Sequence, residues 1–71
     1  MITEALVLKT LVEVMNDKHK VDSDDVIKKL GITQDVLIKY LEPLRQKQYT
    51  IQVLEDITLT EKGLQAYRSL L

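Results

Sequence analysis

The side chains with the greatest potential for chemistry lie close together near residue 20. The basic triplet Lys18-His19-Lys20 is followed directly by Asp22, Asp24 and Asp25. These aspartates superficially resemble part of a calcium-binding loop, but the glycine and the distal glutamate of such a loop are missing. A lone histidine between lysines also has too few partner ligands for a metal site. We therefore expect an exposed His19, aspartates that cap a helix, and no bound metal.

The sequence contains none of the arrangements that are typical of an enzyme. It has no cysteine, no nucleophile with a nearby base, no glycine-rich phosphate loop, and no carboxylate pair that its spacing would place in a cleft. The lack of cysteine also removes disulfides and thiolate metal sites. We expect no enzyme activity and no cofactor, and therefore look for a binding function.

Basic residues are the first candidates for binding. A phosphate-facing surface could combine the triplet Lys18-His19-Lys20 with Lys28, Lys29, Lys39, Arg45 and Lys47. The same residues could equally be separate solvated charges, because spacing alone does not place them on one face. A net charge of −1 argues against strong non-specific binding to nucleic acid, but not against specific binding, which depends on local charge.

Length and composition indicate one domain, residues 1–71, with an aliphatic core. Hydrophobic residues make up 45% of the chain, and its only aromatic residues are three tyrosines. No apolar run approaches the roughly 20 residues of a membrane span, and no basic leader precedes the first apolar residues. We expect a cytoplasmic protein without a membrane partner.

Helical periodicity predicts two helices in the first half of the chain. Residues 3–16 carry a broad apolar sector, which is typical of a central helix but also fits a subunit interface. Asp22 is the expected N-cap of a second helix, with Val21 packing onto Val26. Gly31 supplies the left-handed residue that ends this helix.

A third helix, residues 34–47, follows after a very short turn. Thr33 is its expected N-cap, and its buried stripe is predicted to be Leu37, Leu41 and Leu44. Pro43 removes a backbone hydrogen bond, which predicts a kink, or a break followed by a second short turn. In either case residues 34–40 form a straight presenting surface.

The alternating residues 51–59 predict a β-hairpin. Pairing Val53 with Ile57 and Ile51 with Leu59 places all four side chains on one face and leaves Leu54-Glu55-Asp56 as the loop, with Asp56 left-handed. A two-residue turn at Glu55-Asp56 would divide the apolar set between faces, so we disfavour it.

A final helix closes the predicted order of elements. Thr60 caps it, and its residues Leu64, Tyr67, Leu70 and Leu71 cover the core. Gly63 in its first turn lowers helix propensity, which indicates close approach of another backbone.

These residues resemble the winged helix-turn-helix superfamily of small bacterial and archaeal regulators, including the multiple-antibiotic-resistance type. The resemblance rests on Leu30-Gly31-Ile32-Thr33, the three leucines of the third helix, the hairpin, and Leu59-Thr60-Glu61-Lys62-Gly63. It covers nearly the whole chain and implies an α+β fold, mostly helical, with a β-hairpin wing and a C-terminal helix. It is more specific for fold than for function.

The resemblance implies a DNA-binding transcription regulator whose third helix enters the major groove as the recognition helix. On that basis Gln34, Ile38 and Lys39 are the expected base contacts, alongside Asp35. The expected phosphate contacts are Lys20, Lys28, Arg45 and Lys47. Two copies would enlarge the small basic surface, so a homodimer on double-stranded DNA is expected, and the apolar first helix and Leu70-Leu71 also favour dimerisation.

Three departures from the family pattern leave an alternative open. Gln48 stands where the family usually has glycine, and the wing carries Glu55 and Asp56 where the family often has basic residues. Asp35 stands near the tip of the recognition helix. The alternative is a winged helix that binds a protein partner instead of DNA, with Ile38 as its anchor.

Overall fold

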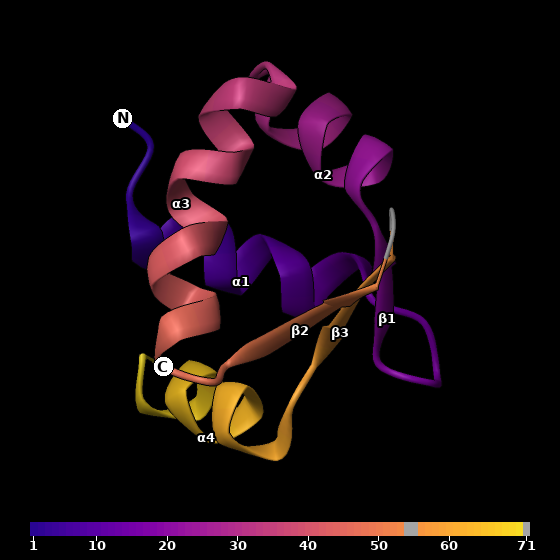
Figure 1. Cartoon of the computed structure of the whole chain (residues 1–71), viewed down its shortest axis with the longest axis vertical. Helices are drawn as coiled ribbons and strands as arrows, with labels where there is room; N and C mark the ends of the chain where they lie inside the picture. Colours follow the sequence, from indigo (N-terminus) through magenta and orange to yellow (C-terminus); the bar gives the residue numbers. More distant parts are fainter. Residues whose placement is uncertain (54–55, 71) are drawn as a thin grey trace.

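The computed structural model describes residues 1–53 and 56–70, which form four helices and a three-stranded antiparallel sheet (Figure 1). The elements in chain order are α1 (Glu4–Val14), β1 (Lys20–Asp22), α2 (Ser23–Leu30), α3 (Gln34–Gln46), β2 (Thr50–Val53), β3 (Asp56–Leu59) and α4 (Glu61–Ser69). The α+β class is the expected one, and this order is compatible with a winged helix. Within the described part of the chain, no helix combines the length and the apolar character needed to span a bilayer.

The predicted helix ends are confirmed where their caps were named. The Asp22 carboxylate accepts from the Asp24 N–H at 2.9 Å, and the Thr33 hydroxyl accepts from the Val36 N–H at 3.3 Å. Gly31 has φ 66° and ends α2 in the left-handed conformation. These caps satisfy backbone groups that the helices leave open, and they fix the short turn between α2 and α3.

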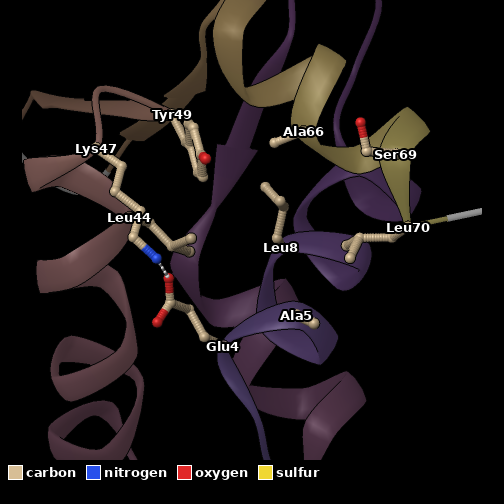
Figure 2. Close-up of a pocket in the computed structure, with 9 residues that line it drawn as sticks. All are labelled: Glu4, Ala5, Leu8, Leu44, Lys47, Tyr49, Ala66, Ser69 and Leu70. Carbon is tan, nitrogen blue, oxygen red and sulfur yellow. Dashed lines mark hydrogen bonds and ion pairs between the residues drawn. The ribbon is translucent and has the colours of Figure 1, made fainter.

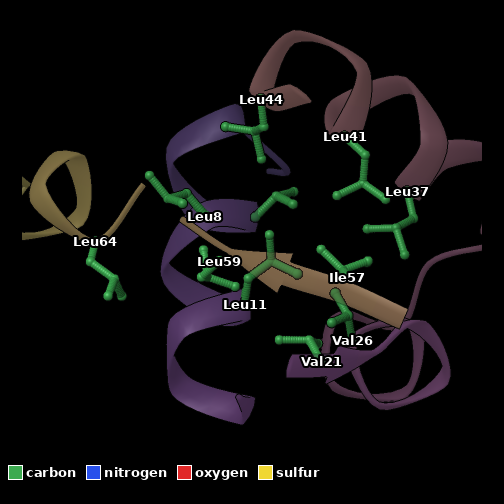
Figure 3. Packing of buried hydrophobic residues seen from close by; sticks show 11 residues of the cluster. Leu8, Leu11, Val21, Val26, Leu37, Leu41, Leu44, Ile57, Leu59 and Leu64 are labelled. Carbon is green, nitrogen blue, oxygen red and sulfur yellow. The ribbon is translucent and has the colours of Figure 1, made fainter. Parts of the chain in front are cut away.

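The core is aliphatic and lies where α1, α3 and the sheet meet. Figure 3 shows Leu37, Leu41 and Leu44 reaching from α3 toward α1 and β3, and all three are buried as predicted. Val7, Leu8 and Leu11 of α1 are also buried. The apolar sector of α1 is thus largely buried within one copy of the chain. The apolar first helix therefore no longer argues for a dimer.

Helix α3 runs through Pro43 without interruption, so the alternative of a break there is wrong. It ends in two hydrogen bonds, from the Tyr49 N–H to the Leu44 carbonyl at 2.9 Å and from the Gln48 N–H to the Arg45 carbonyl at 3.0 Å. This pattern is a Schellman motif, which requires a left-handed residue after the helix. Gln48 takes that conformation with φ 65°, although it is not a glycine.

The predicted hairpin register is wrong by one residue. Val53 pairs with Asp56 and Ile51 with Thr58, whereas Thr50 pairs with Leu59. Asp56 therefore lies in β3 and not in a loop, and Leu54 and Glu55 lie outside the described residues. The shift turns Thr50 inward and leaves Ile51 and Val53 on the outer face of the sheet.

Contacts at the open end of the hairpin and a third strand explain this register. The Thr60 N–H donates to the Tyr49 carbonyl at 3.0 Å. This bond places Tyr49, just before β2, opposite Thr60, just after β3. Strand β1 was not predicted, and it pairs with β3 so that Val21 lies beside Ile57 on the inner face. Because Val21 fills that face, Ile51 and Val53 are not needed there.

The C-terminal helix covers the core less completely than predicted. Leu64 is buried and Tyr67 is partly buried, but Leu70 is exposed. Leu71 lies outside the described residues.

Candidate functional site

The outer face of α3 contains the three predicted base-contact residues. Gln34, Ile38 and Lys39 are all exposed, because the helix turns Leu37, Leu41 and Leu44 inward. Ile38 is the most unusual of the three, since 49% of this large aliphatic residue is exposed. The structure thus brings the predicted trio together on one helix.

Charges along this face alternate in sign and cancel. Asp35 and Glu42 are acidic, Lys39 and Arg45 are basic, and all four are exposed. The Arg45 guanidinium forms an ion pair with Glu42 three residues before it, so one predicted phosphate contact already has a carboxylate partner. A surface pair of this kind contributes about 1 kcal/mol or less to the stability of the fold. The negative charge of Glu42 would nevertheless repel an approaching phosphate group.

Lys47 lies away from the presenting face. Figure 2 shows its side chain reaching from the end of α3 to Glu4 at the start of α1, with the Lys47 Nζ 2.5 Å from the Glu4 Oε1. The hydrogen bond to Glu4 raises the pKa of Lys47 above its ordinary value of 10.5. The pair borders an open groove of about 410 Å³ between α1 and α4, whose apolar lining includes Leu8, Leu44 and Leu70.

The remaining two predicted phosphate contacts lie on two consecutive elements. Lys28 is exposed in the last turn of α2, on the helix that precedes α3. Lys20 is exposed in β1, whereas the strand that contacts α3 is β2, at the opposite edge of the sheet. The four predicted phosphate contacts therefore lie on β1, on α2 and at the C-terminal end of α3, and β1 is the edge strand opposite β2.

The basic triplet has a structural role that the sequence did not reveal. The Asn16 side-chain oxygen accepts from the N–H groups of Lys18 at 2.9 Å and Lys20 at 3.0 Å, which closes the loop. His19 is exposed and takes a left-handed φ of 63°, and its carbonyl accepts from the Leu59 N–H at 2.9 Å. Among the described residues, no three His, Asp or Glu side chains are grouped so that they could hold a metal ion.

The sheet exposes two apolar residues that the predicted register had placed on the same face as Ile57 and Leu59, which are buried. Ile51 and Val53 are 56% and 62% exposed. Ile51 also borders a second groove, of about 460 Å³, between β2 and the end of α3, where Arg45 and Gln48 lie. No local signal in the sequence indicates this surface, because tertiary contacts set the inward turn of Thr50 and the outward turn of Ile51.

Comparison with protein-family models, with curated proteins and with solved structures finds no match to this chain. Its function has to be inferred from its own residues.

Proposed function

We propose that this chain is a protein-recognition module of the winged-helix type and that it binds its partner with the exposed face of α3. The observation that carries the proposal is Ile38, a half-exposed aliphatic residue on a face whose charges cancel. Protein interfaces are typically built around a few such apolar anchors with a mixed polar rim. Gln34, Asp35 and Lys39 would form that rim.

The charge distribution favours a protein over DNA as the partner. Binding to a duplex depends on neutralising several phosphates with lysine and arginine. Here Arg45 and Lys47 are paired with carboxylates, and Lys20 lies at the far edge of the sheet. In addition, residues 50–59 contain no lysine or arginine, so the wing adds no positive charge.

A photo-crosslinking residue at position 38 of the full-length chain tests the proposal. A partner protein should be captured from a lysate by this variant and not by a matched variant with the crosslinker at Gln65, which is exposed on α4. The captured partner should then bind the wild type and Ile38→Val but not Ile38→Asp. Retained binding by a folded Ile38→Asp protein would contradict the proposal.

A second candidate, binding to double-stranded DNA, is favoured by one specific observation. Gln34, Ile38 and Lys39 are exposed together on the helix that follows the α2–α3 turn, and Lys28 is exposed at the end of α2. Gln and Lys side chains can hydrogen-bond to adenine and guanine edges in the major groove. The small basic surface of one copy would then require a homodimer, as in other helix-turn-helix regulators.

A salt titration of binding to duplex fragments tests this second candidate. If Lys20, Lys28, Arg45 and Lys47 all meet phosphates, the slope of log K against log salt should be about −3.6 per copy, at about −0.9 per phosphate. Lys28→Gln should make the slope shallower by about one unit. An absent or salt-independent interaction would exclude DNA binding and leave the protein-recognition proposal standing.

A further inference from the structure

The register of the sheet defines a second surface made of strand residues, of which Ile51 also borders the groove beside the end of α3. Directly paired residues share a face, so the outer face consists of two rows across the three strands. One row is Lys20, Thr58 and Ile51, and the other is Asp22, Asp56 and Val53. We call these six residues the outer sheet face.

The β2 side of the outer sheet face is apolar where edge strands usually carry protection. Strand β2 is an edge of the sheet, and its four residues Thr50–Val53 include no charge and no proline. Natural edge strands commonly carry lysine, proline or a bulge, which discourage other chains from docking. Instead, Ile51 and Val53 present two β-branched side chains to solvent, both more than half exposed. These residues suit an apolar contact with another molecule.

Beside Val53 the same face carries two acidic residues, Asp22 and Asp56, whose repulsion destabilises the isolated chain, while Lys20 lies in the other row. Asp22 and Asp56 are direct cross-strand partners, which brings their Cβ atoms to roughly 5 Å, and like charges in such positions are destabilising. Asp24 and Asp25 are also exposed in the first turn of α2, directly after Asp22. A positive group beside Asp56 would relieve this repulsion and would lie next to Val53.

We propose that the outer sheet face docks a basic protein segment in which pairs of cationic residues follow pairs of apolar residues, so that an extended segment turns side chains of both kinds toward the sheet. The apolar side chains would cover Ile51 and Val53, and the cations would meet Asp22 and Asp56. The proposal is independent of the function proposed for α3, because none of these residues belongs to that helix. It also gives Asp56 a role in binding, whereas a phosphate group would be repelled by this carboxylate.

Titrations of the isotope-labelled full-length chain with three synthetic peptides test the proposal by NMR. The peptides repeat two lysines and two valines, two lysines and two serines, or two glutamates and two valines, so that each face of an extended peptide carries both residue types. The lysine–valine peptide should shift the amides of residues 20–22, 51–53 and 56–58. The lysine–serine peptide should bind at least tenfold more weakly, and the glutamate–valine peptide should cause no shifts. Equal binding of all three, or shifts centred on α3, would overturn the proposal.

Substitutions on the sheet and on α3 test which of the two surfaces binds the peptide. Asp56→Asn, and the double variant Ile51→Ser with Val53→Ser, should each weaken binding of the lysine–valine peptide at least fivefold. Ile38→Ser is the matched control, because it removes a similarly exposed aliphatic residue from α3 and should leave peptide binding unchanged. Circular dichroism confirms that each variant is folded.

Two further outcomes count against the proposal. If Ile38→Ser weakens peptide binding as much as the sheet variants do, the outer sheet face is not a separate site. If Mg²⁺ or Ca²⁺ shifts Asp22 and Asp56 with submillimolar affinity and displaces the peptide, the acidic pair is a cation site and not a docking site.

Discussion

Gly63 lies so close to Tyr49 that a Cβ atom at position 63 would stand 2.2 Å from the Tyr49 carbonyl oxygen. The same carbonyl accepts hydrogen bonds from the N–H and the hydroxyl of Thr60, each at 3.0 Å. The Thr60 hydroxyl in turn accepts from the Gly63 N–H at 3.0 Å. The Thr60 hydroxyl also lies 2.6 Å from the Gln48 carbonyl oxygen, so the end of α3 and the start of α4 are joined through two neighbouring carbonyl groups.

Gly63→Ala should destabilise the protein by about 2–3 kcal/mol, because the added methyl group overlaps backbone atoms that are held by these hydrogen bonds. Urea denaturation followed by circular dichroism measures the loss, which is a large fraction of the stability of so small a domain. A loss below about 1 kcal/mol would show that α4 can move away from Tyr49 at little cost.

Gly31 provides the matched control, because its requirement is conformational and not steric. It has φ 66°, and nothing lies within 4 Å of a Cβ atom built there. Gly31→Asn should therefore cost well under 1 kcal/mol, since asparagine tolerates the left-handed region. Gly63→Asn should lower stability at least as much as Gly63→Ala. Substitution by asparagine should therefore have a small effect on stability at position 31 and a large effect at position 63.

The helices could be predicted from the sequence because each has a local signal. Asp22, Thr33 and Thr60 are capping residues followed by apolar side chains at helical spacing, and the close approach at Gly63 followed from its place in a first helical turn. The sheet could not be predicted in this way. Its register depends on Tyr49 meeting Thr60, and the outward turn of Ile51 depends on Val21, which is 30 residues earlier in the chain.

The candidate site was only partly predictable for the same reason. Exposure of Gln34, Ile38 and Lys39 follows from the periodicity of a single helix. The partners of charged residues do not follow from periodicity. Lys47 and Glu4, for example, are 43 positions apart and meet only because α1 packs against α3. Periodicity therefore locates a surface, whereas tertiary contacts decide which of its charges are available.

Gln48→Gly should stabilise the protein by up to about 1 kcal/mol. A left-handed residue with a side chain costs about 1–2 kcal/mol, and the greater freedom of glycine in the unfolded chain offsets part of the gain. Thermal denaturation should show a midpoint higher by a few degrees. Gln46→Gly, within the last turn of α3, should instead lower stability by about 0.5–1 kcal/mol. Equal effects at both positions would argue against a left-handed Gln48.

The Lys47–Glu4 pair should make stability depend on pH in the alkaline range. Because the hydrogen bond to Glu4 raises the pKa of Lys47 above 10.5 in the folded state, its contribution is fully present below pH 10.5 and is lost as the pH rises through the raised pKa. A ¹³C NMR titration of the Lys47 Cε should show a higher pKa in the wild type than in Glu4→Gln.

Asp56→Asn should stabilise the free protein by about 0.2–1 kcal/mol, because it removes a like-charge pair with Asp22 across neighbouring strands. The gain should shrink in high salt, since both carboxylates are exposed and the repulsion is screened. Denaturation at low and high ionic strength measures both effects. Asp17→Asn changes the net charge equally in an exposed loop, and it should leave stability nearly unchanged. If Asp56→Asn is no more stable than Asp17→Asn, the acidic pair is not strained, and a cationic partner would have no repulsion to relieve there.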